Sequence, residues 1–352
     1  MLKLVRIIAA LLFPVIIAGV LLVGYVDHYF DRRLQIEGDS AVMLLERGTG
    51  FSTMVNQAAE RGWIAQPGVL KIAARIVPSM AEVRAGEYQV HAGTTVGQWL
   101  AMMRNGEVVR HHFTFVEGWT VKQLLSQLKG SPMLADETLV AGPELWAQLG
   151  IEAPLAKHPE GLFFPDTYDF HRGDEPSLLL RRAYQRMESV LMDEWEKRQP
   201  NLPLATPYEA LILASIIEKE TGVPGERGEI AGVFIRRLQK GMRLQTDPTI
   251  IYGMGDAYQG NIRSRDLRDD SNPYNTYRIN GLPPTPIALA GREAIHAALQ
   301  PEPGSSLFFV AKGDGSHYFS ETLAEHEAAV RQYQLRRRQD YRSSPAPKGA
   351  GQ

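Results

Sequence analysis

The chain has 352 residues, of which 44% are hydrophobic and 22% are charged, with a formal net charge of -2. This is the composition of an ordinary folded protein, so it excludes a disordered chain, and the length is sufficient for two domains. A pI near 6.5 gives no sign of the basic face that nucleic-acid-binding proteins carry, so we exclude nucleic acid as a partner. Because the sequence has no cysteine, metal sites with thiolate ligands are excluded as well.

The N-terminal segment carries an apolar run. After Lys3 and Arg6, no charged residue occurs from Ile7 to Val26. About 20 apolar residues cross a hydrocarbon core of about 30 Å, so residues 7–26 are predicted to be a transmembrane helix that follows a cytoplasmic N-terminus at 1–6. A cleavable signal peptide would have a shorter apolar region and a small-residue cleavage site, and neither is evident. Loop charges alone leave the orientation undecided, but the short leading segment favours export of the C-terminal part.

A juxtamembrane linker at 27–37 leads to a predicted small α+β module at 38–115. The pattern predicts helices at 51–64, 67–77 and 94–106 and strands at 87–90 and 108–116. The strand, helix, strand order from Gly86 to Phe115 resembles part of a LysM-like peptidoglycan-binding module. A packing or spacer module is the alternative. The adjacent residues His111 and His112 face opposite sides of a strand, so they cannot both bind one metal ion.

Residues 116–335 are predicted to form a larger mixed α/β domain. An amphipathic helix is expected at 178–198, and a hairpin followed by a helix at 304–330. The end of the chain, 336–352, is basic and then rich in Pro, Gly and Ser, which predicts a disordered tail.

The most informative stretch of this domain is TPYEALILASIIEKETG, residues 206–222. Thr206 is a plausible N-cap, and Glu209 completes a capping box, with Gly222 as the expected stop. Apolar residues between these signals cover every face of the helix, which indicates that it is buried inside the domain.

Glu218 comes near the end of that buried helix, on the side of Leu211, Ala214 and Ser215. Partial desolvation and the negative end of the helix dipole both raise the pKa of a carboxyl group, so Glu218 is predicted to donate a proton near neutral pH. The alternative is a structural ion pair with Lys219, Arg227 or Arg237. Glu220 points to a different side of the helix and is interpreted as a structural partner for an arginine or a backbone donor.

Five segments of the chain resemble, in order and spacing, the motifs of the YceG-like endolytic murein transglycosylases. These segments are EGLFFPDTY (160–168), ASIIEKETG (214–222), MRLQTDPTIIYGMG (242–255), YNTYRINGLPPTPI (274–287) and HYFSETLAEHE (317–327). Two local departures from the family pattern are Arg236 and the Ala290-Gly291 pair.

The resemblance implies an enzyme anchored in the bacterial inner membrane, with its catalytic domain on the periplasmic side. Such an enzyme cleaves the β-1,4 bond between MurNAc and GlcNAc within glycan strands and leaves a 1,6-anhydroMurNAc end. Glu218 matches the catalytic acid/base of the family. No cofactor or metal is implied, and peptidoglycan synthases of the elongation or division machinery are expected as partners, because cleavage would terminate growing strands. By the same match, the candidates for the glycan groove are Gln245, Asp247, Tyr252, Tyr274, Asn275, Tyr277 and His317.

Three other functions stay open at this point. In a muramidase, Asp247 would act as the base and Glu218 as the acid, and water would enter the product. A non-catalytic peptidoglycan-binding anchor for cell-wall synthases would need no acid at all. A soluble cytosolic enzyme would require that residues 7–26 do not insert into a membrane.

Overall fold

The computed structural model describes residues 2–335, and the predicted tail at 336–352 lies outside the described residues. The chain divides into two compact units. Unit 1 contains the chain up to His111 together with 169–173, and unit 2 contains 112–168 and the chain from Asp174 onward. Both units combine helices with two-stranded sheets, so the mixed helix and strand class predicted from the sequence is confirmed.

Unit 1 is built around a two-stranded antiparallel sheet. Its strands β1 and β2 pair from Ser40 with His91 to Leu45 with Gly86. The elements of unit 1 are α1 (Leu2–Phe30), β1 (Ser40–Leu45), α2 (Phe51–Glu60), α3 (Pro67–Ile76), β2 (Gly86–His91) and α4 (Val96–Asn105). Strand β1 was not among the predicted elements. Because β2 pairs with β1, the segment 86–115 does not form a sheet of its own.

Helix α1 extends beyond the predicted span at both ends. Its stretch Leu12–Phe30 is long and apolar enough to cross a membrane, with a mean hydropathy of 1.7. Val20, Leu21 and Val23 are exposed, whereas Tyr29 is buried against unit 1. The last turns of α1 are therefore part of the fold of unit 1, while the exposed apolar length precedes them.

Unit 2 is mainly helical. Its helices are α5 (Val121–Lys129), α6 (Leu145–Leu149), α7 (Pro176–Glu196), α8 (Pro207–Glu220), α9 (Arg227–Gln239), α10 (Asp247–Met254), α11 (Arg292–Leu299) and α12 (Leu323–Val330). Strands β5 (Phe308–Ala311) and β6 (His317–Ser320) form the predicted hairpin of this unit. A third strand pair of the described chain is β3 (His111–Thr114) with β4 (Thr167–Phe170), and its residues are divided between the two units.

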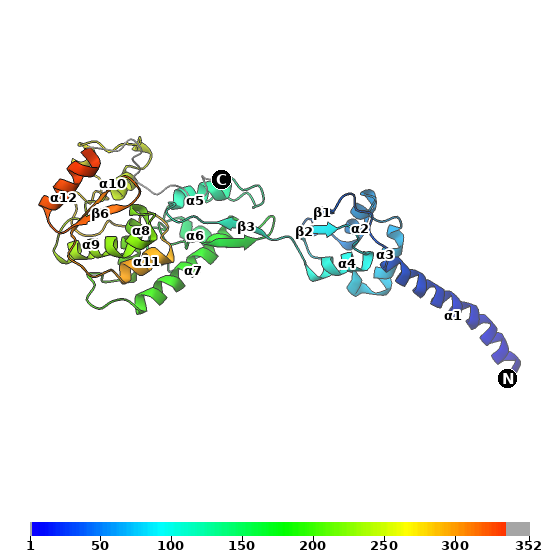
Figure 1. Ribbon diagram of the computed structural model, residues 1–352. Coiled ribbons are helices and arrows are strands. Elements are labelled where there is room, and N and C mark those ends of the chain that lie inside the picture. The colour runs from blue at the N-terminus through cyan, green and yellow to red at the C-terminus, as the bar shows by residue number, and fades with distance from the viewer. Residues whose placement is uncertain (1, 336–352) are drawn as a thin grey trace. The chain divides into compact units, whose positions relative to one another are not determined.

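Helix α8 is the centre of unit 2. It contacts α7, α9, α10 and α11 (Figure 1). Every residue from Ala210 to Ile217 is buried, which confirms the prediction of a buried helix. The Thr206 hydroxyl accepts a hydrogen bond from the Glu209 amide at 3.2 Å, as predicted.

The ends of α8 differ in detail from the sequence prediction. The Glu209 carboxylate accepts a bond from the Ala205 amide instead of the Thr206 amide, so the capping box is not reciprocal. The helix ends at Glu220 because Thr221 is already extended, with φ -139° and ψ 136°. Gly222 is thus not the residue that stops the helix.

We predict that Thr206→Ala loosens the first turn of α8, because the Glu209 amide loses its capping acceptor. Loss of an N-cap hydroxyl costs about 1 kcal/mol, which is roughly a fivefold faster exchange for amides that open locally. Hydrogen exchange measured by mass spectrometry on the full chain checks this in peptides that cover 207–213. Thr120→Ala is the matched control, because the Thr120 hydroxyl caps α5. Unchanged exchange in α8, or equal effects of both variants on α8, would contradict the assignment.

Candidate active site

Glu218 lies in the last turn of α8, and 7% of its side chain is exposed. Its Oε2 accepts a hydrogen bond from the Gly291 amide at 3.1 Å, and its Oε1 lies 3.9 Å from Nη2 of Arg227. The Lys219 ammonium is directed elsewhere, to the Gly118 carbonyl at 3.1 Å. Of the three cations that could pair with Glu218, Arg227 alone forms an ion pair with it within residues 2–335, at a distance too long for a hydrogen bond.

Burial raises the pKa of Glu218, and the negative charge of Glu117 raises it further. The Gly291 amide, Arg227 and Lys219 act in the opposite direction. The prediction of a raised pKa is confirmed. The second cause of the raised pKa is the Glu117 carboxylate, whereas the sequence predicted the helix dipole as the second cause.

Glu117 reaches this site because residue 291 has no side chain. A Cβ at Gly291 would lie 1.9 Å from Oε1 of Glu117. The segment of Glu117 is fixed to the 289–291 segment by backbone hydrogen bonds, from the Gly118 amide to the Leu289 carbonyl and from the Leu289 amide to the Trp119 carbonyl. Both segments therefore face the end of α8.

A second buried carboxyl, Glu160, was missed by the sequence analysis. Its Oε1 accepts from the Val121 amide and its Oε2 from the Tyr252 hydroxyl, each at 3.0 Å. Burial raises the pKa of Glu160 to about 7. The ring of Tyr252 packs edge-on against Tyr274, whose hydroxyl lies 2.9 Å from Oγ1 of Thr285. The sequence signal that could have identified Glu160 is its position at the start of the 160–168 segment, directly before an apolar run.

Glu220 is the third carboxyl with a raised pKa, which burial brings to about 7. It accepts a hydrogen bond from the Thr246 hydroxyl. Glu220 therefore has a partner within the protein, but that partner is the Thr246 hydroxyl and not the predicted arginine or backbone donor. Asp247, which follows Thr246 in the chain, raises the pKa of Glu220 further through its negative charge. The Asp247 carboxylate accepts a hydrogen bond from the Tyr277 hydroxyl at 2.9 Å.

Gln245 lies in the same turn and has a positive φ of 53°, an uncommon conformation for a residue other than glycine. Its amide donates to the Thr276 carbonyl, and its Oε1 accepts from Arg237 at 3.3 Å. Arg237 also donates to the carbonyls of Arg243 and Leu244, so one buried guanidinium supports the turn that presents Gln245.

Two of the predicted groove residues are occupied by bonds within the protein. The Asn275 side-chain nitrogen donates to three carbonyls between Asp266 and Asp269, and the residue is fully buried. His317 is 5% exposed at its side chain, and both its amide and its Nδ1 bond to Glu226. Glu226 directly precedes Arg227, so the turn at these two residues connects His317 with Glu218. Gln245 and Asp247 are exposed, and the three predicted tyrosines are half-buried.

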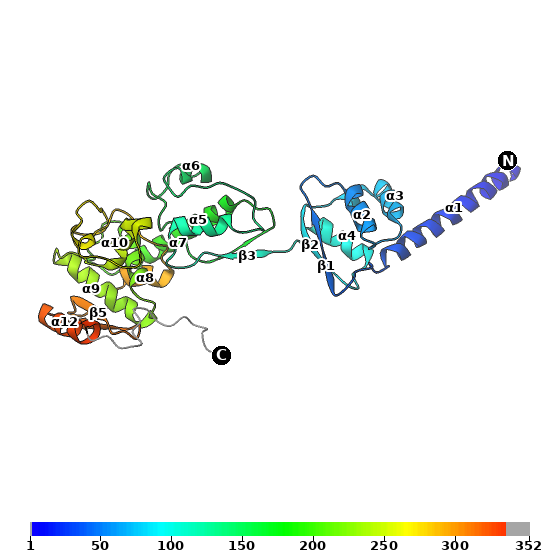
Figure 2. The ribbon, with the colours of Figure 1, turned by 90° about the horizontal axis from the view of Figure 1, so that it is seen from above.

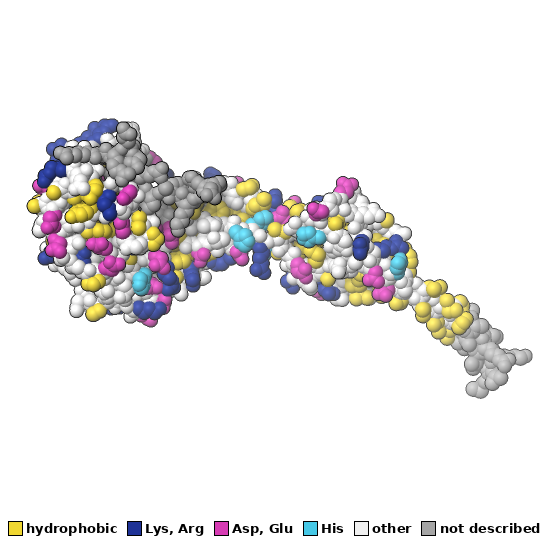
Figure 3. Space-filling model, in the orientation of Figure 1, with side chains coloured by type: hydrophobic (Ala, Val, Ile, Leu, Met, Phe, Trp, Pro, Cys, Tyr) yellow, Lys and Arg dark blue, Asp and Glu magenta, His cyan; other side chains and the backbone are white. Residues whose placement is uncertain are grey.

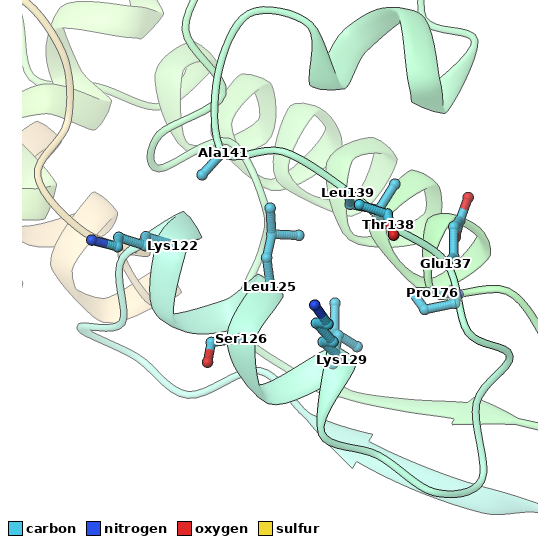
Figure 4. Close-up of a pocket in the computed structure, with 10 residues that line it drawn as sticks. Lys122, Leu125, Ser126, Lys129, Glu137, Thr138, Leu139, Ala141 and Pro176 are labelled. Atoms are coloured by element: carbon cyan, nitrogen blue, oxygen red, sulfur yellow. The ribbon is translucent and has the colours of Figure 1, made fainter.

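One cavity of unit 2, about 310 Å³ in volume, lies between α5 and the segment 137–141 (Figure 4). Its lining includes Lys122, Lys129 and Glu137 but none of the candidate site residues. Lys122 also pairs with Asp256 at 2.6 Å, and Glu137 accepts from the Ser177 amide at 2.8 Å. The candidate site is therefore assigned from the chemistry around Glu218 and not from this cavity.

The chain is similar to known proteins over most of its length. The model of the YceG-like family matches residues 43–332. A Bacillus subtilis (strain 168) protein named endolytic murein transglycosylase is 31% identical over 271 residues, covering 71% of this chain and 73% of that one. A protein of the same name from Streptococcus pneumoniae serotype 2 (strain D39) is 27% identical over 283 residues. That match covers 72% of this chain but 51% of the longer relative.

A solved structure agrees with these matches. A crystal structure of a YceG-like protein from Listeria monocytogenes aligns with a TM-score of 0.50 and 28% identity, covering 83% of this chain and 99% of that chain. By both the family match and the identity to its relatives, the chain belongs to the YceG-like family.

Proposed function

We propose that the protein is an endolytic peptidoglycan lytic transglycosylase and that Glu218 is its catalytic acid and base. The environment of Glu218 is the observation that supports this residue as the acid. Its carboxyl is shielded from solvent and has a raised pKa, and one of its oxygens lies 3.9 Å from the Arg227 guanidinium. The names of the Bacillus and Streptococcus relatives support the reaction class. The substrate is the MurNAc-β-1,4-GlcNAc bond within glycan strands, and the product end is 1,6-anhydroMurNAc.

Glu218 serves the reaction in two steps. It first donates its proton to the glycosidic oxygen while the bond from that oxygen to C1 breaks and an oxocarbenium-like state develops. The C6 hydroxyl of the same sugar then attacks C1 and gives its proton back to Glu218. The new bond joins C1 to O6, no water is consumed, and no second protein carboxylate is needed. Intramolecular attack benefits from proximity.

The surroundings of Glu218 stabilise both the protonated and the ionised carboxyl, as a group that acts first as an acid and then as a base requires. Burial and Glu117 favour the protonated state before bond cleavage, whereas the Gly291 amide and Arg227 stabilise the carboxylate afterwards. The Nε of Arg227 has no hydrogen-bond partner within the described residues.

The glycan groove follows the loops attached to the end of α8. Asp247 and Tyr277, joined by a hydrogen bond, present polar groups to the sugar hydroxyls, and Gln245 lies in the same turn. The half-buried rings of Tyr252 and Tyr274 supply apolar contact to a sugar face. Asn275 and His317 position loops of the groove, because both residues are buried and their polar groups are bonded within the protein.

Helix α1 anchors the protein in the bacterial inner membrane, and both units lie on the periplasmic side. The order β1, α2, α3, β2 gives unit 1 two helices between two antiparallel strands, which supports a LysM-like role in holding glycan strands. An anchored enzyme meets strands while they are being polymerised, so cleavage terminates their growth. Peptidoglycan synthases of the elongation or division machinery are the partners that this role requires.

We predict that Glu218→Gln lowers the cleavage rate by about 10²–10⁴-fold, because an amide cannot donate the proton. The full chain is incubated in detergent with nascent uncrosslinked strands and with sacculi, and product ends are identified by mass spectrometry. The native chain should yield anhydro ends, which weigh one water less than reducing ends. Glu220→Gln is the matched control, because glutamine can still accept the bond from Thr246; we expect it to retain activity within about tenfold.

Three outcomes of this experiment would contradict the proposal. Reducing ends would make the protein a muramidase. Loss of activity in Glu220→Gln but not in Glu218→Gln would show that Glu220, and not Glu218, is the acid. The absence of cleavage on both substrates would favour a peptidoglycan-binding anchor.

We predict that Glu117→Gln moves the alkaline limb of the pH-rate profile to lower pH, by up to about one unit. Removal of the Glu117 charge lowers the pKa of Glu218, so the proton needed for cleavage is lost at a lower pH. Rates of anhydro-end formation from pH 5 to 9 check this. Lys219 and Arg227, the other charges near Glu218, are kept. Glu152→Gln, on an exposed loop, should leave the profile unchanged; an identical profile for Glu117→Gln would refute the influence assigned to that residue.

A further inference from the structure

Helix α3 exposes apolar side chains on the surface of unit 1. Ile72, Ile76 and Val77, at its C-terminal half and end, are 56%, 68% and 44% exposed. Leu70 and Ala73 of the same helix are buried in the core of the unit. The helix is therefore apolar on its core side and also on part of its outer side. Ile72 and Ile76 are four residues apart, so they lie on one face. A contiguous exposed apolar surface of this kind marks an interaction site.

The N-terminal end of the same helix lies where α1 joins unit 1. Gln66, the N-cap of α3, accepts hydrogen bonds from the hydroxyls of Tyr25 and Tyr29, the latter at 3.0 Å to its carbonyl. Within unit 1, α3 lies on the side of α1 and the sheet of β1 and β2 on the other side, in both ribbon views (Figures 1 and 2). The segment of the chain proposed to span the membrane thus ends beside α3.

Basic side chains lie on α3 and directly after α1. Arg75 is exposed on α3, and Lys71 is half-buried with its ammonium 2.6 Å from Oδ1 of Asn56. Arg32 and Arg33 are exposed just after α1, with Asp27 and Asp31 near them. Figure 3 shows hydrophobic, basic and acidic side chains on the part of unit 1 next to α1. Apolar side chains bordered by arginine and lysine are the pattern of a surface that lies in the headgroup region of a bilayer.

We propose that the C-terminal half of α3, with Ile72, Ile76 and Val77, inserts into the phospholipid surface of the membrane that α1 spans. The inference rests on the proposed anchoring by α1 and adds a second lipid contact to it. A single spanning helix leaves the attached unit free to tilt and rotate. Two contacts fix one face of unit 1 to the bilayer, which sets the direction in which the unit presents its remaining surface to glycan strands.

The absence of cysteine allows a clean test by single labels. Ile76→Cys carries an environment-sensitive fluorophore, and the full chain is reconstituted into phospholipid vesicles that contain anionic lipid. Phe13→Cys in α1 reports on anchoring. Leu44→Cys on β1 is the matched control, because Leu44 is also an exposed apolar residue of unit 1, at 38%. Ile72→Cys repeats the measurement at a second position, so a folding defect of one variant does not decide the result.

We expect labels at 76 and 72 to emit at shorter wavelength than the label at 44 and to be quenched at least about threefold more strongly by lipids with a shallow nitroxide. A label at 76 that iodide reaches as readily as it reaches 44, while 13 is quenched by lipid nitroxides, would overturn the inference and leave the anchor intact. A blue-shifted label at 76 without quenching by lipid would place a protein there and also overturn it. Lack of lipid quenching at 13 would refute the anchoring itself.

Discussion

The burial of α8 is the constraint on which unit 2 depends. Its last two turns hold three loops through four different side chains. Ser215 accepts a hydrogen bond from the Ile287 amide, and Glu218 accepts one from the Gly291 amide. Lys219 donates to the Gly118 carbonyl. Glu220 accepts a bond from the Thr246 hydroxyl. Successive residues of a helix are rotated by about 100°, so three adjacent charged residues point to three different loops. The sequence Glu-Lys-Glu thus assembles the site from segments that are distant in the chain.

A raised pKa alone does not identify the acid, because burial raises the pKa of four glutamates in this unit, Glu160, Glu218, Glu220 and Glu229. Both oxygens of Glu160 accept hydrogen bonds, from Val121 and Tyr252, and Glu220 is bonded to Thr246. These carboxyls are engaged in holding the fold. Glu218 differs because one oxygen accepts a single amide bond and the other faces Arg227 at 3.9 Å. The proposed acid is the carboxyl that has one oxygen beside a cation but beyond hydrogen-bond distance from it.

The sequence predicted the features that depend on neighbouring residues. The burial of α8, its Thr206 cap, the capped helix at 94–106 and the C-terminal hairpin follow from periodicity and short-range signals, and the structure confirms them. Strand β1 escaped because its pairing with β2 lies about 45 residues away along the chain. The influence of Glu117 on Glu218 and the bonds of Glu160 were equally beyond reach, since they depend on tertiary contacts. Side chains such as Asn275 matched a motif, but only their bonding distinguishes loop support from substrate contact.

The balance around Glu218 explains why one carboxyl can serve both steps of the proposed reaction. A bidentate arginine at hydrogen-bond distance would lower the pKa strongly and keep the group ionised, so that no proton could be donated. Burial without any donor would have the opposite effect and make proton release costly. The amide of Gly291 supplies a fixed donor that cannot titrate, and Arg227 adds a weaker attraction from 3.9 Å. Gly291 is needed for a second reason, because its missing side chain admits Glu117, whose charge favours the protonated state. Gly291 therefore has two effects on Glu218. Its amide stabilises the ionised carboxylate, and its missing side chain leaves room for Glu117, which favours the protonated carboxyl.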